Sequence, residues 1–425
     1  MEPPDAALVV EGSSSEIEKG GKNLRGRWKG LLRAAGKFSY WGLLWVLHPL
    51  NLYLARRKRG VKHPDSVLHI SYMVHIPYYT TRLLRRFGIR ADYLAIGASP
   101  VWHQCDFQKK PSPLSALVAW EEFRLLWRVV AKYEIIHLHF MICLSELGWE
   151  LPLLKRMGRK IVVHYRGCEA RDRKRLTALH PRMNICQQCD YDAFCETKSC
   201  GRRRALARKY GDYFLVTTPD LKDFVPEAEH LPFFAPEIEE EPALPARLNS
   251  DRIFKIVHVT NHPGLEGTDQ IRDAVERLRE KGHAIHFVFL RGVPPDQVIR
   301  EYRDADLAIG KMKMGWYANA QIESMALGVP TITYVRPEFM TDELRDSGFI
   351  FTTLEGVEQT LEYYLTHPEE LEKKRRIARS SILRLHDNAK LCRWLIDLYA
   401  GLKKQSEWNP HSSAAGSCKR DRGHA

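Results

Sequence analysis

Acidic side chains are absent from residues 19–59, a stretch in which eleven residues are Lys or Arg. The chain of 425 residues carries a formal charge of +13, so removing the +11 of this stretch leaves +2 for everything else. A nucleic-acid groove needs basic charge spread over the folded domains. The distribution therefore argues against a nucleic-acid partner and favours an anionic surface that meets one N-terminal segment.

A cleavable signal peptide is also missing, because the first twenty residues are polar and partly acidic. We therefore expect a cytoplasmic protein in a reducing compartment, where the nine cysteines are not disulfide-bonded by default. The polar ends of the chain, residues 1–23 and 405–425, lack the apolar content of a packed core, and we expect both to be disordered.

Charged residues are missing from residues 38–55, an aromatic stretch of eighteen residues. A helix of this length reaches about 27 Å, the lower limit for crossing a bilayer. His48, Pro49 and Asn51 disfavour a clean span. We favour an in-plane or re-entrant anchor on an anionic membrane, with a transmembrane helix and packing onto the protein itself as alternatives. Apolar residues preceding the stretch fall at helical spacing, with basic residues mostly between them: Leu24, Trp28, Leu31, Ala35 and Phe38.

Strand-like and helix-like segments alternate through both halves of the remaining chain, the pattern of parallel sheets covered by helices. In such sheets ligands bind outside the carboxyl ends of the strands. We therefore expect the turn at residues 260–268 and the helix start near Asn319 to face one cleft. The main elements expected in the second half are strands at residues 254–259, 284–290 and 331–334 and helices at residues 269–281 and 318–330.

The first half shows the same alternation, and its long helical pattern at residues 114–132 is the clearest element. A last amphipathic helix is predicted at residues 388–404. The other expected elements are strands at residues 67–71, 93–96, 134–139, 160–164 and 213–217 and helices at residues 78–87, 146–157 and 202–210.

Three segments in the second half resemble the nucleotide-sugar-binding half of retaining, family 4-like ("group 1") glycosyltransferases with the GT-B fold. They are Glu266-Gly267-Thr268, Ala305-Asp306 before a strand, and residues 322–330, Ile-Glu-Ser-Met-Ala-Leu-Gly-Val-Pro. The resemblance implies an α/β fold of two doubly wound, Rossmann-like domains facing a cleft, with a C-terminal helix crossing back. It implies that Glu323 binds the donor ribose, whose two hydroxyls suit the two oxygens of a carboxylate. The other predicted donor-binding residues are Gly267, Thr268, Lys311, Lys313, Gly315 and Asn319.

Three positions depart from the family pattern. Gly315 stands where a second glutamate usually contacts the donor sugar, and Glu266 stands where a lysine usually neutralises the diphosphate. A carboxylate near a diphosphate repels it. Either another cation neutralises the diphosphate, or the donor is held differently, or activity is weak or lost. Lys311, Lys313 and Arg291 are the nearest candidates. Arg166 replaces a histidine that the family carries before a glycine.

Polar residues follow predicted strands of the first half. His139, Arg166 and Glu169 are the predicted catalytic residues, and His137 and Arg171 the predicted acceptor-binding residues. His137 and His139 share one face of a strand, because side chains alternate with a period of two. They either contact a substrate or form a satisfied pair at a strand end. An arginine at position 166 suits a phosphate-bearing acceptor or the donor diphosphate.

Four cysteines lie within fifteen residues: Cys186, Cys189, Cys195 and Cys200. Four thiolates suit a closed structural zinc site, with an iron–sulfur cluster or unliganded thiols as alternatives. Cys168 is a fifth thiol expected nearby. No catalytic metal is expected, because the resemblance implies that protein cations and helix N-termini stabilise the leaving diphosphate.

The sequence thus predicts a glycosyltransferase, peripherally bound at the cytoplasmic membrane face, that moves a sugar from a nucleotide donor to a lipid-linked or polysaccharide acceptor. The alternative is a catalytically degenerate GT-B protein that binds a glycan, a nucleotide or a partner enzyme. The expected segments are a tail at 1–23, a membrane-associating segment at 24–60, an acceptor-side domain at 61–245 with a Cys-rich insertion at 186–200, a nucleotide-sugar domain at 246–385, a closing helix at 386–404 and a tail at 405–425.

Overall fold

The structure is a computed structural model that describes residues 24–58, 63–100, 102–190, 195, 198–238 and 253–407. The predicted tail at residues 1–23 and nearly all of the one at 405–425 lie outside these ranges. Side chains are described from residue 39 onward, so the apolar stripe expected from Leu24 to Phe38 also lies outside the described part.

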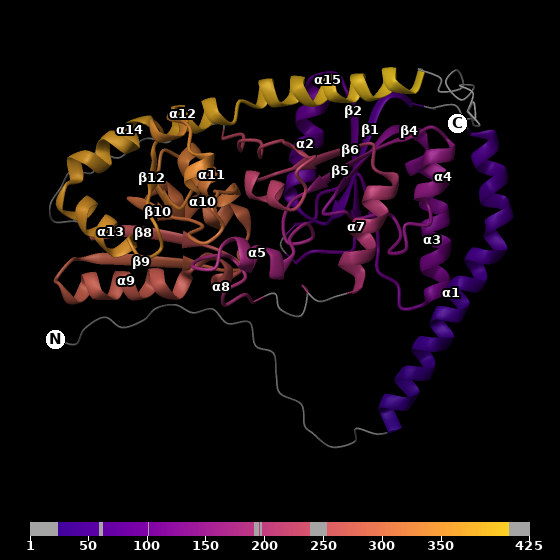
Figure 1. Cartoon of the computed structure of the whole chain (residues 1–425), viewed down its shortest axis with the longest axis horizontal. Helices are drawn as coiled ribbons and strands as arrows, with labels where there is room; N and C mark the ends of the chain where they lie inside the picture. Colours follow the sequence, from indigo (N-terminus) through magenta and orange to yellow (C-terminus); the bar gives the residue numbers. More distant parts are fainter. Residues whose placement is uncertain are drawn as a thin grey trace, which may run out of the picture.

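A seven-stranded parallel sheet forms the core of the first half (Figure 1). Its strand order is β3-β2-β1-β4-β5-β6-β7, so the chain starts in the middle of the sheet and winds toward both edges. In the register of the central strands, His69 lies opposite His137, and His139 lies opposite His164. The strands are β1 (His63–Tyr72), β2 (Arg90–Ile96), β3 (Phe107–Lys109), β4 (Tyr133–His139), β5 (Lys160–Tyr165), β6 (Tyr213–Val216) and β7 (Glu229–His230).

Helices cover both faces of this sheet. The helix expected at residues 146–157 is shorter than predicted, because Gly148 adopts a left-handed φ of 64° and ends the preceding turn before Leu151. The helices of this half are α1 (Leu24–Arg57), α2 (His75–Arg86), α3 (Ser115–Arg128), η1 (Val130–Lys132), α4 (Leu151–Arg156), α5 (Arg173–Leu179), α7 (Lys198–Tyr210) and η2 (Pro219–Asp223).

A five-stranded parallel sheet in the order β12-β11-β10-β8-β9 forms the core of the second half. The predicted apolar face of α9 is confirmed, since Ile271, Ala274, Val275 and Leu278 are all buried. The strands are β8 (Phe254–Val259), β9 (Ile285–Leu290), β10 (Leu307–Ile309), β11 (Thr331–Thr333) and β12 (Phe349–Phe351). The helices are α8 (Pro263–Glu266), α9 (Thr268–Glu280), α10 (Pro295–Arg303), α11 (Asn319–Ala326), η3 (Pro337–Phe339), α12 (Asp342–Arg345), α13 (Val357–Thr366), α14 (Pro368–Leu385) and α15 (Asn388–Glu407).

The last helix, α15, runs from the second half back along the first, as predicted (Figure 1). Leu395, Tyr399 and Leu402 are buried against Val67 of β1 and Ile135 of β4, in a cluster that joins the last helix to the first sheet. The two-sheet architecture with a returning helix confirms the predicted fold class.

Helix α1 is one continuous helix that contains Pro49, and one of its faces packs onto α3. The Tyr40 hydroxyl donates to Oε2 of the buried Glu122 at 2.6 Å. Nε1 of Trp127 donates to Oδ1 of Asn51 at 2.7 Å, and both groups are buried. Within the described residues, no helix has the length and apolar composition that a membrane span requires.

Candidate functional site

The two halves meet through segments that follow strand ends. His75, just after β1, accepts a hydrogen bond at Nε2 from Nδ2 of Asn319, the first residue of α11, at 3.3 Å. Arg336, after β11, donates from Nη1 to Oδ2 of Asp223 in η2 at 2.6 Å. The two halves therefore contact each other through residues that follow β1 and β11. The single cleft expected for residues 260–268 and Asn319 stays a prediction.

A cavity lies at this interface, between α2, α11 and the connecting segment at residues 233–237. Glu323, on the second turn of α11, lines the cavity together with Asn319 on the turn before it. From the first half, His75 and Tyr79 of α2 line the opposite wall. The predicted pair Asn319 and Glu323 is therefore brought together, while His75 and Tyr79 had no sequence signal and were missed.

The Glu323 carboxyl group is partly buried, and within the described part of the chain it has no hydrogen-bond or ion-pair partner. Burial alone raises the pKa of Glu323 to about 7. Burial also lowers the pKa of the facing His75 to about 4, so that this histidine is neutral at pH 7. A carboxyl group held without a partner in an interdomain cavity has its acceptor oxygens available to a ligand that donates hydrogen bonds.

The turn between α8 and α9 holds Gly267 at a left-handed φ of 83°. Thr268 is buried, and its hydroxyl lies 2.8 Å from Nε2 of His258, whose Nδ1 lies 2.8 Å from the carbonyl oxygen of Ile309. Because Nδ1 must donate to that carbonyl, Nε2 accepts the threonine proton. The hydroxyl of Thr268 thus supports the turn, which leaves backbone N–H groups as its means of binding phosphate.

Two lysines lie beside this turn. Lys311 forms an ion pair with Glu266, so the carboxylate that departs from the family pattern is neutralised. Lys313 donates from Nζ to the carbonyl oxygens of Gln187 at 2.5 Å and Gly264 at 2.9 Å. Of the three cations predicted for the diphosphate, Lys311 is paired with an acid, Lys313 bonds to two backbone oxygens, and Arg291 is exposed.

A neighbouring side chain fills the space where a side chain at position 315 would lie. A Cβ at this position would lie 2.5 Å from Cγ of Arg336, and φ at Gly315 is 83°. The side chain of Arg336 therefore fills the space beside the glycine. Arg336 also lines a second interdomain cavity, together with Arg171 and Lys313. Arg336 is the cation that sequence reasoning missed, because nothing in the sequence links it to position 315.

The start of the cysteine-rich segment bridges the two halves. The Gln188 carbonyl oxygen lies so close to Gly264 that a Cβ there would be only 1.9 Å away. Oε1 of Gln188 also accepts from Gln270 of α9 at 3.1 Å. Together with the Lys313 contact, these interactions fix residues 187–190 against the turn at Gly264.

The predicted zinc site gains no support. Cys186 is buried, Cys189 and Cys195 are partly buried, and none of the three is in a disulfide within the described part of the chain. The side chain of Cys200 lies outside the described residues. Among the side chains that are described, the set of three potential ligands within mutual reach consists of histidines, not cysteines.

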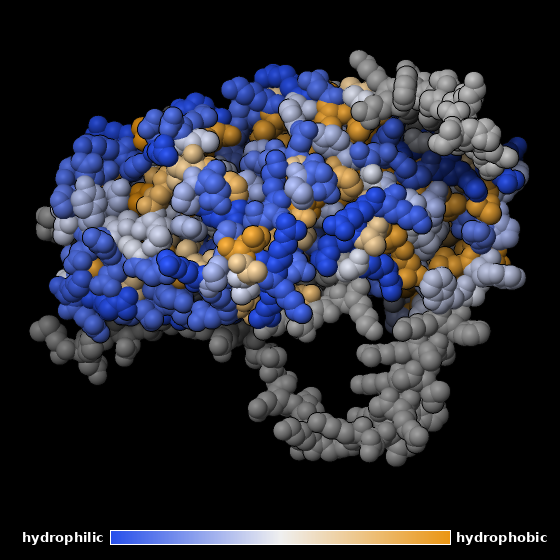
Figure 2. Space-filling model, viewed as in Figure 1, coloured by the Kyte–Doolittle hydropathy of each residue, from blue (hydrophilic) through white to orange (hydrophobic). Residues whose placement is uncertain are grey.

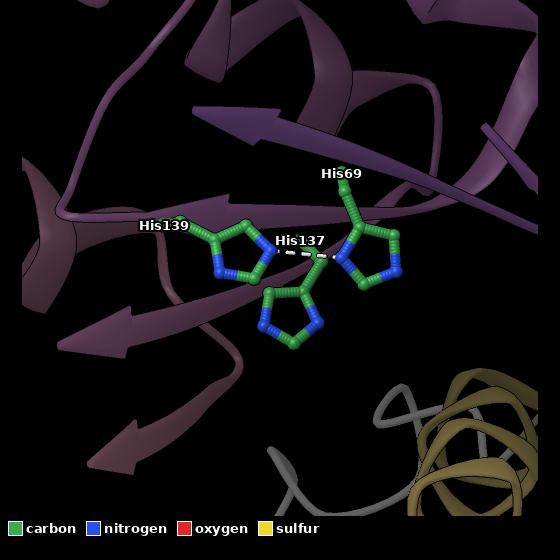
Figure 3. Close-up of side chains that lie close together, drawn as sticks. All are labelled: His69, His137 and His139. Atoms are coloured by element: carbon green, nitrogen blue, oxygen red, sulfur yellow. Dashed lines mark hydrogen bonds between the residues drawn. The ribbon is translucent and has the colours of Figure 1, made fainter. Parts of the chain in front are cut away.

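That set is His69, His137 and His139, which are all 0% exposed (Figure 3). On this face of the sheet, the side chains change from apolar to polar along each strand. Val67 is followed two positions later by His69, and Ile135 is followed two positions later by His137. The predicted shared face of His137 and His139 is confirmed, with ring centroids 4.5 Å apart. His164 of β5 joins them, with its Nδ1 3.2 Å from Nε2 of His137.

Arg166 fixes the tautomers of this histidine layer. Its Nε donates to Nδ1 of His139 at 2.8 Å, so the proton of neutral His139 is on Nε2 and is donated to Nδ1 of His69 at 2.8 Å (Figure 3). The hydroxyl of Tyr399 in α15 lies 2.7 Å from Nδ1 of His137. Burial is the first cause that lowers the pKa of each of these histidines, and the charge of Arg166 adds to it, so all are neutral at pH 7.

A metal ion does not fit the histidine triad. The planes of His137 and His139 are inclined by only 11°, so their in-plane lone pairs cannot converge on one ion. A metal on Nε2 of His139 would require a proton on Nδ1, where Arg166 already donates. The triad is a hydrogen-bonded network that ties α15 to the sheet.

The predicted residues that follow β5 are also engaged. Oε1 of Glu169 accepts from the backbone N–H groups of Arg166 and Gly167, and burial raises the pKa of Glu169. The guanidinium of Arg166 points to the histidines, and burial lowers its pKa to about 9. Arg171 donates to Oδ2 of Asp220 at 2.6 Å and lines the second cavity. The roles predicted for His137, His139, Arg166, Glu169 and Arg171 remain predictions.

Comparison with family models and with curated protein sequences gives no match. Comparison with solved structures does. Sucrose-phosphate synthase from Thermosynechococcus elongatus aligns with a TM-score of 0.55 at 14% identity, covering 80% of this chain and 100% of the other. Anabaena HepE in complex with UDP and glucose aligns with a TM-score of 0.54 at 10% identity, covering 80% and 100%. The catalytic domain of Arabidopsis thaliana starch synthase IV, bound to ADP and acarbose, aligns with a TM-score of 0.53 at 11% identity, covering 80% of this chain and 99% of the other. The chain therefore has the GT-B fold.

Proposed function

We propose that this chain is a glycosyltransferase that takes a sugar from a nucleotide-sugar donor. The observation that carries the proposal is the carboxyl group of Glu323, which lines an interdomain cavity without a partner among the described residues. Solved structures with the same fold contain UDP or ADP. A ribose offers two hydroxyl donors, which match the two oxygens of an ionised carboxylate.

The positive charge for a diphosphate would come from residues around the turn at Gly267. Lys313 and Arg336 line the neighbouring cavity, and Lys311 cancels the charge of Glu266. Backbone N–H groups at the start of α9 would add donors aimed at an anion. This arrangement offers a compensation for the missing lysine and for Gly315, and it requires no catalytic metal.

The acceptor that we propose is lipid-linked or a polysaccharide, reached at the cytoplasmic face of a membrane. Exposed aromatic residues on α1, including Trp45 at 79% exposure, and the acid-free basic stretch around them suit peripheral contact with anionic lipid. Hexosyl transfer and retention of the anomeric configuration follow from the sequence resemblance and belong to the same proposal.

Thermal stabilisation by a panel of nucleotides and nucleotide sugars tests the proposal. We expect one base and sugar to raise the melting temperature of the wild type, because a ligand that binds only the native state stabilises it. Glu323→Gln should lose most of this effect, whereas Glu280→Gln, at an exposed position of α9, should keep it. Equal stabilisation of Glu323→Gln would contradict the assignment of Glu323.

The second candidate is a catalytically degenerate GT-B protein that binds a glycan, a nucleotide or a partner enzyme. The contact between Lys313 and the carbonyl oxygen of Gln187 favours it, because this contact takes up a cation that a diphosphate would need. Stabilisation by nucleotides without transfer or hydrolysis of any nucleotide sugar would support this candidate over the enzyme.

A further inference from the structure

An apolar groove lies between α1 and α4, at the end of the first half farthest from the second sheet (Figure 1). Figure 2 shows hydrophobic residues gathered on the visible face between α1 and its neighbouring helices. The groove is separate from both interdomain cavities, because none of its lining residues is shared with them. Its apolar walls include Trp41, Trp45, Leu52, Trp149, Pro152 and Leu153.

The groove is held open by a buried polar contact beneath it. Oε2 of Glu122 in α3 accepts from the hydroxyl of Tyr40 on α1 at 2.6 Å and from Nε1 of Trp149, just before α4, at 3.0 Å. Lys109 neutralises Glu122 at 2.5 Å. One buried carboxylate thus fixes both walls, so the groove is formed before any ligand enters.

The formal charge among the residues that line the groove is positive. Arg156 lines its edge and has no acidic partner among the described residues. Arg56 and Arg57 end α1, and the stretch from residue 19 to residue 59 contains no Asp or Glu. Tryptophan rings beside basic side chains are typical of the level where lipid headgroups meet acyl chains. A partner with an apolar chain and an anionic head complements this surface in both respects.

We propose that the groove between α1 and α4 binds one acyl chain of an anionic phospholipid, with Arg156 facing the lipid phosphate. The inference rests on the membrane contact in the proposed function and deepens it, from adsorption on a charged surface to a site for a single lipid. Membrane contact through α1 then selects lipids by both chain and headgroup.

Gly42 offers a way to fill the groove without changing its charge. It lines the groove, and a Cβ at this position meets no heavy atom within 4 Å. Gly42→Phe places a ring in the groove, and replacing a helical glycine favours the helix. Gly401→Phe is the matched control, because Gly401 lies at an exposed position of α15 with equally open space.

The probe is dioctanoyl phosphatidylglycerol below its micelle concentration, titrated by calorimetry against the full chain. We expect the wild type, Gly42→Ala and Gly401→Phe to bind it alike, and Gly42→Phe to bind at least about tenfold more weakly. Arg156→Gln should lose the preference for phosphatidylglycerol over dioctanoyl phosphatidylcholine. Circular dichroism establishes that each variant is folded.

Equal binding by Gly42→Phe and the wild type would overturn the proposal. So would a wild-type dimer that Gly42→Phe converts to a monomer while neither binds lipid, because the groove would then be an interface between copies. Nucleotide stabilisation of the same variants separates the two proposals: its absence in a wild type that binds lipid contradicts only the glycosyltransferase function.

Discussion

The carboxyl group of Glu323 has a pKa of about 7 because burial disfavours its charged form. If the carboxylate accepts from a ribose, binding needs the ionised form, which predominates above pH 7. We therefore predict that the affinity for the stabilising nucleotide falls about tenfold between pH 8 and pH 6. Calorimetric titrations across this range measure the effect.

The control for this prediction is Glu323→Gln, which cannot ionise at this position. Its affinity should be low and should change less with pH than that of the wild type. A pH dependence of equal size in the variant would assign the titration to the phosphate or to another protein group.

Gly315 shows how a departure from a family pattern is explained by a residue distant in sequence. We predict that Gly315→Ala lowers the free energy of unfolding by about 2–3 kcal/mol, because its Cβ would lie 2.5 Å from Arg336 Cγ at a φ of 83°. Gly282→Ala has a φ of 94° and no atom within 4 Å of its Cβ, so it should lower the free energy of unfolding only by the cost of a left-handed alanine backbone, about 1 kcal/mol. Chemical denaturation measures both, and equal losses would contradict the steric contact with Arg336.

At the scale of elements, α1 is docked on α3 by specific buried bonds. Tyr40→Phe removes the donor to Glu122 and should lower the free energy of unfolding by about 1–2 kcal/mol. Tyr53→Phe, at an exposed position of the same helix, should change it by less than about 0.5 kcal/mol. If Tyr40→Phe were as stable as the wild type, α1 would not be an integral part of the first domain.

Elements with strong patterns were predicted from the sequence, and those set by a single turn were not. The face of α9 was predicted because Ile271 and Leu278 repeat at the helical period. Helix α8 was expected as a turn, since four residues are too few to show a period. Helix α5 was also missed, because its basic sequence gives one buried residue, Leu176.

For the whole molecule, the buried histidines predict an acid-sensitive fold. Burial lowers the pKa of His69 to about 3 and those of His230 and His386 to about 4. The unfolded chain then binds protons below about pH 6.5 that the folded chain does not bind. The free energy of unfolding should therefore fall as the pH drops from 6.5 toward 4, by up to roughly 1.4 kcal/mol per pH unit for each histidine.

Denaturant unfolding at several pH values tests this prediction. His386→Gln should reduce the pH dependence of the free energy of unfolding by about one proton, because glutamine does not titrate. The side chain of His386 joins Tyr317 of the second half to the carbonyl oxygen of Phe233. Unfolding midpoints that stay constant from pH 7 to pH 5 would contradict the lowered pKa values of these histidines.

The candidate site was predicted in part. Asn319 and Glu323 were found because the motif around them is local in sequence, and both line one cavity. The pairing of Lys311 with Glu266 and the contact of Arg336 with Gly315 depend on loops from different strands. Such contacts have no periodic signal, so the structure was needed to find them.

The central claim is that Glu323 binds the ribose of a nucleotide donor. Its most direct test compares the affinity of the best nucleotide with that of its 2′-deoxy analogue, in the wild type and in Glu323→Gln. We predict that the wild type prefers the ribonucleotide by about tenfold and that the variant shows little preference, since the missing hydroxyl and the missing carboxylate remove the same hydrogen bond. An equal preference in both proteins would show that Glu323 does not contact this hydroxyl and would contradict the account.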